Sequence, residues 1–345
     1  MKQTNFFLHI SKIILFSGIL VATASARAEL KVVTTIKPLH SLISNVMDGV
    51  GEPGLIIDGS ISPHSFTMKP SHAKMLEEAD VIFWIGESIE TSMEEPLDTI
   101  AKDAEVIEFM ELDSIAKLKF REESIFGDHD DHDDHDDHDD HDDHDDHDDH
   151  DDHDDHDDHD DHDDHDDHSG HDDHGHAHGE FDAHIWLDPM NAKEMVHEIA
   201  HELSDLDPAN KDKYEANAQA TIQALDQLVK DIEKEINKDA KFVVFHDAYQ
   251  YFEERFETRA AGALTLNTDV LPGAKQIADI QDVIKDRGIK CIFSEPQFNP
   301  KIITTIAEDM NIKTGVFDPL GANIDSNKDL YFKLIQNLGN ELKGC

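Results

Sequence analysis

Short runs of β-branched and aromatic residues recur along this chain, each followed by a stretch with helical spacing, and the alternation occurs in two separate blocks. Such alternation predicts parallel sheets, because parallel strands need a crossover that is usually helical. We therefore expect an α/β fold with two lobes and with binding sites at the carboxyl ends of the strands, facing the cleft between the lobes. The expected strands are 30–36, 54–58, 80–86 and 105–110 in the first block and 241–247, 260–266, 290–296 and 313–319 in the second.

A long helix is expected between the two blocks, over about 207–238. Its apolar residues recur at spacings of three and four, which keeps them on one face of an α-helix. This rigid helix would join an N-terminal lobe, 29–206, to a C-terminal lobe, 239–345, and would resist wide hinge bending. The apolar residues are Tyr214, Ala218, Ile222, Leu225, Val229, Ile232 and Ile236, and shorter helices are expected after Pro38 and over 71–79, 91–102 and 191–205.

An insert over 128–178 interrupts the first lobe with an Asp and His triplet that repeats as far as His168. The period of three matches neither a helix nor a strand, and the repeat offers no apolar side chain to bury, so we expect a disordered loop. The insert contains 29 Asp residues, a large part of the formal charge of −49. A chain this acidic is expected to repel nucleic acid and anionic membranes and to attract cations.

The first 28 residues have the pattern of a secretory signal peptide. Lys2 and Lys12 precede an apolar stretch, and ASARA offers an A-x-A cleavage site that ends at Ala28. The stretch is shorter than the roughly 20 residues that a membrane-spanning helix needs, so no membrane insertion is expected. We therefore expect a periplasmic protein. In that oxidising compartment Cys291 and Cys345 favour one structural disulfide over two free thiols.

The insert carries a histidine at every third position, which a purely solubilising charge run would not need. Imidazole nitrogens and carboxylate oxygens are ligands for Zn²⁺ and similar cations, and His-rich tracts are typical of metal binding. Because ordering a flexible segment costs entropy, we expect these sites to be weak. The candidate weak ligands include His129, His132, His168, His171, His174, His176 and His178.

Three other histidines fall where strands are expected to end. His64 follows the second strand, His184 lies just beyond the insert in FDAHIWLDP, and His246 ends the strand KFVVFHD. Each of them alone would more often be a structural histidine than a ligand. Together, at the strand ends of a two-lobed fold, they predict one fixed metal site in the cleft. Asp318, after the last strand, is expected to be a fourth ligand or a hydrogen-bond partner of a ligand.

The stretch HEIAH, from His197 to His201, matches the H-E-x-x-H pattern of zinc proteases. On the expected helix, however, both histidines point away from the apolar stripe and toward solvent, and the longer metzincin pattern does not continue. A hydrolase that uses Glu198 with these histidines is the less favoured alternative. Because G-x-S-x-G, P-loop and G-x-G-x-x-G motifs are absent from the sequence, we expect a binding protein and no enzyme. We expect His40 and His72 on the surface.

The segments ISPHSFTMKPSHAKMLEEADVIFWIG, HIWLDP, FHDAYQYF, SEPQF and FDPLG together resemble the ZnuA family, the periplasmic metal-binding component of ABC zinc uptake systems. The resemblance covers about 30–345. It implies two (β/α)4 lobes joined by a rigid helix, one Zn²⁺ in the cleft, and delivery by a monomer to an ABC permease with its cytoplasmic ATPase. It also implies that His64, His184 and His246 are the ligands, and a C-terminal cysteine pair occurs in some zinc members.

Two sequence details bear on the choice of metal. Related manganese and iron binders usually carry a carboxylate where this chain has His246, and three imidazoles suit Zn²⁺ better than Mn²⁺. Some zinc members carry Glu directly before the first ligand, where this chain has Pro63. The fourth position is therefore open to water, Asp318 or an insert histidine, and the insert would be a low-affinity zinc antenna or sensor. The alternatives are a manganese or iron transport protein of the same cluster and a periplasmic metal buffer.

Overall fold

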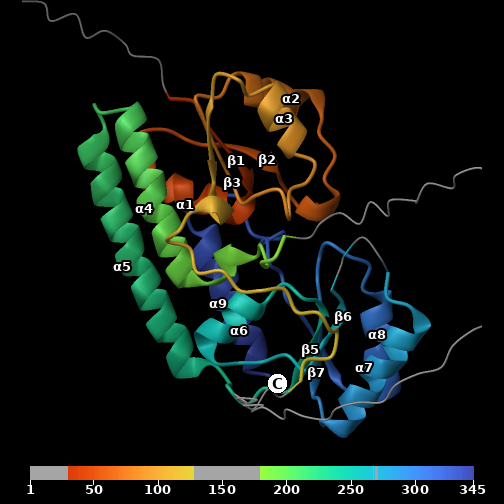
Figure 1. The fold of residues 1–345 in the computed structure, drawn as a ribbon. Coiled ribbons are helices and arrows are strands. Elements are labelled where there is room, and N and C mark those ends of the chain that lie inside the picture. The colour runs from red at the N-terminus through yellow and green to blue at the C-terminus, as the bar shows by residue number, and fades with distance from the viewer. Residues whose placement is uncertain (1–29, 128–178, 267, 269–270) are drawn as a thin grey trace, which may run out of the picture.

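The computed structural model describes residues 30–127, 179–266, 268 and 271–345. The signal peptide predicted over 1–28 and the insert predicted over 128–178 lie outside these residues. The described chain contains two four-stranded sheets, one above the other in Figure 1, and all strand pairs are parallel. The predicted α/β fold with two parallel-sheet lobes is confirmed.

The N-terminal sheet has the strand order β2-β1-β3-β4. Val33 of β1 lies between Gly54 of β2 and Ile82 of β3. Every residue of β1 and β3 is buried, as expected for central strands of a sheet with helices on both faces. The four strands lie within the predicted runs and span β1 (Val32–Ile36), β2 (Gly54–Ile57), β3 (Val81–Trp84) and β4 (Glu105–Glu108).

The helices of this lobe begin at prolines in two cases. Pro38 lies in the first turn of α1 and Pro70 begins α2, where the missing N–H of proline has no intrahelical partner to lose. The predicted helices after Pro38 and over 71–79 are confirmed, whereas the helix predicted over 91–102 is only six residues long. The elements are α1 (Lys37–Val46), η1 (Pro63–Ser65), α2 (Pro70–Glu77), α3 (Glu94–Thr99) and η2 (Phe109–Glu111).

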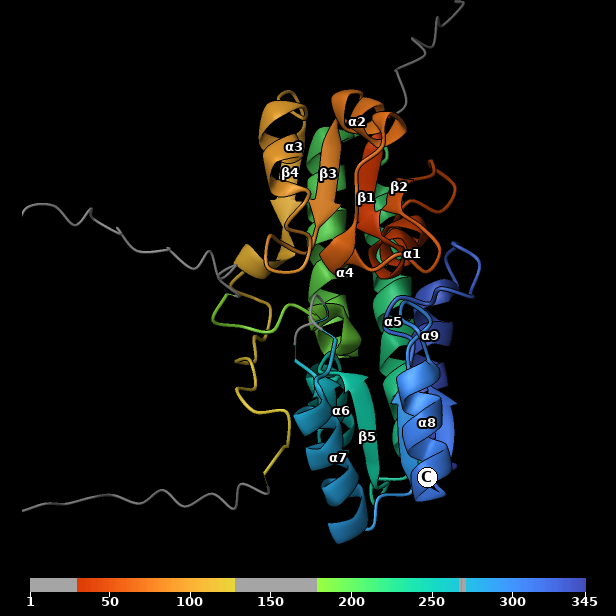
Figure 2. The ribbon, with the colours of Figure 1, turned by 90° about the vertical axis from the view of Figure 1, so that its right-hand side faces the viewer.

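The C-terminal sheet repeats the arrangement with the order β6-β5-β7-β8. His246, the last residue of β5, pairs with Thr265 of β6, so it lies at the carboxyl edge of the sheet. Figure 2 shows β5 below the N-terminal sheet, with α6 and α7 on one side and α8 on the other. The elements are β5 (Phe242–His246), α6 (Gln250–Phe256), β6 (Ala263–Thr265), α7 (Ala274–Asp286), β7 (Cys291–Ser294), α8 (Lys301–Met310), β8 (Lys313–Val316) and α9 (Leu330–Leu342).

Two long helices run beside both sheets in Figure 1: α4 (Pro189–Leu206) and α5 (Lys211–Glu235). They pack against each other, and the predicted apolar stripe of α5 supplies the buried residues Tyr214, Ala218, Leu225 and Ile232. Asp188 caps the start of α4 by accepting a 2.8 Å hydrogen bond from Met190 N. The helix α5 falls inside the predicted span 207–238, and the domain boundaries at 206 and 239 stay predictions.

One apolar cluster extends through both lobes. It contains Ile36 of β1 in the N-terminal sheet, Trp186 of η3 (Ile185–Leu187), Phe252 of α6 and Tyr331 of α9. The indole Nε1 of Trp186 donates a 2.8 Å hydrogen bond to the Pro319 carbonyl, and Tyr331 Oη donates to the Trp186 carbonyl at 2.7 Å. Separating the lobes would expose this shared apolar surface to water, so the structure opposes wide opening.

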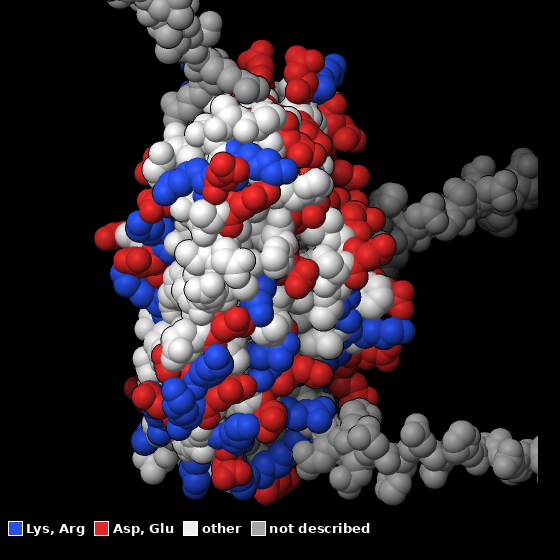
Figure 3. Space-filling model, turned by 90° about the vertical axis from the view of Figure 1, so that its left-hand side faces the viewer, with Lys and Arg blue, Asp and Glu red and all other residues white. Residues whose placement is uncertain are grey.

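The disulfide predicted between Cys291 and Cys345 is present and ties the C-terminus to the beginning of β7. Its location is at the amino end of the strand, opposite to the edge that carries His246. On the face covered by α4 and α5, Figure 3 shows Lys and Arg side chains interspersed with Asp and Glu. Among the described residues, no helix has the length and apolar character to cross a membrane.

Candidate metal centre

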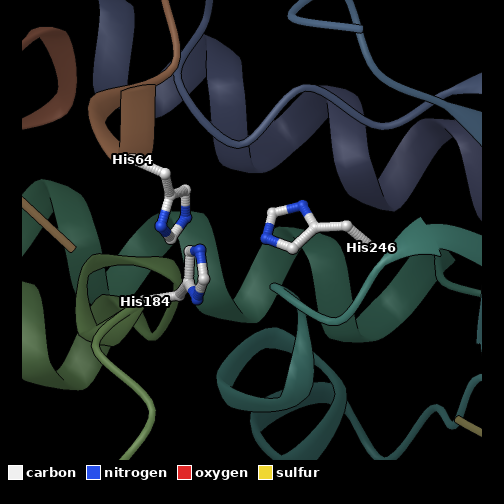
Figure 4. A group of neighbouring side chains, drawn as sticks. All are labelled: His64, His184 and His246. Atoms are coloured by element: carbon white, nitrogen blue, oxygen red, sulfur yellow. The ribbon is translucent and has the colours of Figure 1, made fainter. Parts of the chain in front are cut away.

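The three predicted histidines meet between the lobes, and each comes from a different segment. His64 lies in η1, in the connection that follows β2, and His184 immediately precedes η3. His246 ends β5 of the other lobe. Figure 4 shows the three rings turned toward one another. His64 and His184 are 120 residues apart in the sequence, and His184 and His246 are 62 residues apart, yet the three side chains converge on one point.

The ring positions approach those of a three-histidine metal site. One nitrogen from each ring lies within 4.8 Å of the other two, and the ring centroids are 5.0 to 5.7 Å apart. A tetrahedral zinc ion with Zn–N bonds of about 2.0 Å separates its nitrogens by roughly 3.3 Å. The nitrogens would therefore approach one another by at most about 1.5 Å around an ion of this size. Among the described residues, these three histidines form the group of His, Cys, Asp or Glu side chains whose ligand atoms lie close enough together to hold a metal ion.

His184 is held in one orientation by Asp182. The ring Nδ1 lies 2.6 Å from Asp182 Oδ1, and the same oxygen accepts the backbone N–H of His184 at 2.9 Å. Because a carboxylate only accepts, Nδ1 carries the hydrogen and Nε2 keeps its lone pair. The second oxygen of Asp182 accepts a 2.7 Å bond from Gln250 Nε2, and the Asp182 side chain is fully buried. The pair fixes both the ring plane and the tautomer.

His246 has the equivalent arrangement with Glu295. Its Nδ1 lies 2.9 and 3.1 Å from the two carboxylate oxygens, and both side chains are buried. Burial lowers the pKa of His246, but the charge of Glu295 and its hydrogen bond, with Asp247 and Asp182 adding to them, raise it above its ordinary value. The Nε2 of His246 is buried and has no hydrogen-bond partner among the described residues. A buried lone pair without a partner is costly, and a bound cation would satisfy it.

The space between the rings is small. The cavity that contains the three histidines encloses about 10 Å³, enough for one water-sized sphere. Its other walls are mainly apolar, and Ile89, Trp186, Phe298 and Leu320 are among them. Such a cavity suits a single bare ion, whereas an organic ligand would need far more room.

Asp318 does not join this group of histidines. Its Oδ1 accepts hydrogen bonds from Gln297 Nε2 and from the backbone N–H groups of Leu320 and Gly321, and its Oδ2 accepts one from Ala322 N at 2.7 Å. The carboxylate therefore organises the turn that follows β8. Gly321 has a φ of +68°, a left-handed conformation that favours glycine in such a turn. The predicted role of Asp318 as a fourth ligand stays a prediction.

A family model described as "Zinc-uptake complex component A periplasmic" matches residues 32–345. The chain belongs to the ZnuA family. Among curated relatives named "High-affinity zinc uptake system protein ZnuA", the protein of Brucella abortus is 49% identical over 91% of each chain. The relative from Haemophilus influenzae is 38% identical over 97% of this chain and 98% of its own.

Solved structures of lower sequence identity share the fold. A crystal structure of ZnuA has a TM-score of 0.65 at 20% identity, with coverage of 90% of this chain and 98% of that one. The periplasmic zinc-binding protein TroA of Treponema pallidum has a TM-score of 0.68 at 17% identity, with 92% and 98% coverage. At this identity the likeness concerns the two-lobed fold alone, and it agrees with the family assignment made by sequence.

The protease-like motif lies away from the histidine cluster of this ZnuA family member. His197 and His201 are exposed on α4, as predicted, while Met195 and Val196 point into the core. The groove beside them also contains Lys211 of α5. Within the described chain, these two histidines belong to no group of three ligand side chains close enough to hold a metal ion.

The prediction that His40 and His72 lie on the surface is wrong for His40. Its side chain is buried on the inner face of α1, where Nε2 lies 3.2 Å from the Pro53 carbonyl. His72 is half-buried and stacks on Phe66 at a centroid distance of 5.3 Å. Nearly every residue of α1 is buried, because α4, α5 and α9 also pack against this helix, and the sequence pattern does not show these distant partners.

Sequence reasoning did not identify Asp182 and Glu295, the two carboxylates that orient the histidines. For Asp182 a local signal existed, because it lies two residues before His184 and short side chains commonly bond a nearby backbone N–H. Glu295 lies 49 residues after His246, and only the pairing of β5 with β7 brings the two together. Its position at the end of a strand next to a ligand strand was the available signal.

Proposed function

We propose that this chain captures Zn²⁺ in the periplasm and delivers it to an ABC permease for uptake. The observation that carries the proposal is the meeting of His64, His184 and His246 around a cavity of single-ion size, with Asp182 and Glu295 orienting two of the rings. The membership in the ZnuA family and the names of the curated relatives support the same function.

The donor set favours zinc over the harder cations. Three imidazole nitrogens are borderline ligands that suit Zn²⁺, while manganese is usually held by more oxygen ligands. The carboxylates of Asp182 and Glu295 accept the Nδ1 hydrogens and direct the Nε2 lone pairs of His184 and His246 toward the cavity. We expect water in the fourth position, because Asp318 is occupied with the turn that it caps.

The chain would act as a carrier of the ion and catalyse no reaction. Zn²⁺ is the cargo, and the structure must release it at the permease. The insert would add weak zinc sites beside the tight one, an inference that comes from its composition alone. Periplasmic delivery requires export, for which the signal peptide predicted over 1–28 provides the route.

The decisive test is a zinc competition titration of the mature full-length chain against a high-affinity chelator. We expect one tight site in the wild type and its loss in His64→Ala, while the weaker sites of the insert remain. The matched control is His201→Ala, which removes an exposed histidine of α4 and should leave the tight site intact. Equal loss in both variants, or tight binding that survives His64→Ala, would contradict the proposed ligand set.

A growth assay distinguishes uptake from buffering. A strain that lacks its own zinc uptake protein, supplied with a cognate permease, should grow under zinc starvation with the wild-type chain. His64→Ala should not restore growth, although it keeps every histidine of the insert. If both chains restored growth equally, storage of zinc by the insert would be the function that matters.

A further inference from the structure

The segment that leads into the insert lies against the metal centre. Residues 118–126, here called the strap, come from the N-terminal lobe and run along the C-terminal lobe, as the yellow trace in Figure 2 shows. At its far end the strap pairs with β6: Phe126 N donates to the Ala261 carbonyl at 3.1 Å, and Ala263 N donates to the Ser124 carbonyl at 2.8 Å. The strap is thus a bridge between the lobes.

The near end of the strap contacts the residue that orients His184. Asp182 N donates a 2.8 Å hydrogen bond to the Leu118 carbonyl, and Leu118 N donates to Tyr251 Oη at 2.9 Å. The same tyrosine hydroxyl donates to the Asp182 carbonyl at 2.6 Å. The backbone of Asp182 is therefore fixed between the strap and α6, while its side chain holds the His184 ring.

Arg121 anchors the middle of the strap. Its guanidinium forms a 2.8 Å ion pair with Asp247 Oδ1 and a 2.6 Å ion pair with Glu253 Oε2, and those carboxylates are only 4% and 3% exposed. The guanidinium also lies 4.1 Å from the ring centroid of Phe126. Asp247 directly follows His246 in the chain. One arginine thus connects the strap to the backbone of a second candidate ligand.

We infer that Arg121 is a positioning residue for the metal centre. By binding Asp247 and Glu253, it keeps the strap against α6 and keeps Asp182 and His246 in their places. The inference rests on the proposed function and adds a role to it: Arg121 slows the release of bound Zn²⁺ without touching the ion. The forked guanidinium suits this role because it bonds two carboxylates at once, which a lysine ammonium does less well.

The test measures how fast the most slowly released Zn²⁺ leaves the full-length chain after an excess of chelator is added. Loss of an outer partner of a metal ligand typically weakens binding by about 10-fold to 100-fold. Because Arg121 bonds neither histidine directly, we expect Arg121→Ala to have an effect at the lower end of this range and to release the ion about tenfold faster. Lys119→Ala is the control from the same strap, because its ammonium pairs with Glu180 in an exposed bridge, and it should release zinc at the wild-type rate.

A second variant protects the test from a folding defect. Arg121→Ala alone leaves two buried carboxylates without a cation, whereas Arg121→Ala with Glu253→Gln keeps the net charge of the trio at −1. The double variant should melt near the wild-type temperature in the metal-free state and still release zinc rapidly. Slow release from the double variant would overturn the inference.

Rescue by lysine separates positioning from general stabilisation. Arg121→Lys restores the charge with a single ammonium, so it should recover the melting temperature more fully than the slow release. If Arg121→Lys recovered the melting temperature and the slow zinc release to the same extent, Arg121 would be a purely structural residue and the inference would be overturned. If the wild type showed no slowly released zinc, the proposed function would fail. If the wild type released zinc slowly and the Arg121 variants released it at the same slow rate, this inference alone would fail.

Discussion

Replacing Glu295 by Gln should weaken zinc binding while leaving the fold intact. Glutamine has nearly the same shape, but it loses the charge that accepts Nδ1–H of His246 at 2.9 and 3.1 Å. Carboxylate partners of metal-bound histidines contribute about 10-fold to 100-fold in affinity, or roughly 1.4 to 2.7 kcal/mol. Because Glu295 is 3% exposed, solvent does not screen this interaction, and the full range applies. We expect the Kd of the tight site to rise by that factor.

The same substitution should leave a signature in the metal-free protein. Glu295 helps to raise the pKa of His246 above its ordinary value. A raised histidine pKa contributes stability that is fully present below the unfolded-state pKa of about 6.5 and is lost as pH rises through the folded-state pKa. The wild type should therefore melt above Glu295→Gln by the largest margin at low pH, and the margin should shrink as pH rises.

Chelator competition at neutral pH measures the first effect, and thermal melting of metal-free protein over a pH series measures the second. Glu215→Gln on the exposed side of α5 provides a control for the loss of one carboxylate charge. If zinc affinity in Glu295→Gln stayed within twofold of the wild type, Glu295 would not orient a ligand. The assignment of His246 Nε2 to the metal would then lose its main support.

Three further predictions concern the disulfide, pH and the protease-like motif. Cys345→Ser should lower the free energy of unfolding by up to about 4 kcal/mol, from the chain entropy of a bridge that spans 54 residues, and calorimetry should show zinc affinity nearly unchanged. Zinc affinity should fall as pH drops, because binding requires neutral imidazole and the pKa of His246 is raised, and competition titrations over a pH series measure this fall. Glu198→Gln should change neither zinc affinity nor the background in a peptidase assay, and a peptidase activity abolished by this change would restore the hydrolase alternative.

The sheets could be predicted because their strands have a local signature. The central strands β1, β3 and β5 are fully buried runs made mainly of β-branched and aromatic residues, as expected in a sheet covered on both faces. The helix predicted over 91–102 was too long, since α3 begins only at Glu94 and a turn precedes it. The return of α9 against α1 and α5 had no local signal, because it depends on packing between distant segments.

The candidate site was predictable in its metal-facing residues and less so in the groups that support them. His246 at the end of a strand is visible in the sequence, and with His64 and His184 in loops of the same α/β fold it suffices for a hypothesis. Glu295 and Arg121 act through neighbours distant in sequence, so only the folded chain reveals their contacts. Asp318 lies in the sequence Asp-Pro-Leu-Gly, which is typical of a capped turn, and it accepts backbone hydrogen bonds in that turn, whereas its role as a fourth ligand stays a prediction.

For a site that takes up and releases an ion, the surface that each movement would expose to water favours one route of opening. Lys37 of α1 donates hydrogen bonds from Nζ to the carbonyls of Gly321 and Ile324 at 2.8 and 2.7 Å, which ties the lobes together beside their shared apolar cluster. His184 and His246 are each held by a buried carboxylate. His64 is only half-buried, and the segment 58–61 before it is exposed. Because moving that loop costs far less buried surface than parting the lobes, His64 is the ligand expected to leave first.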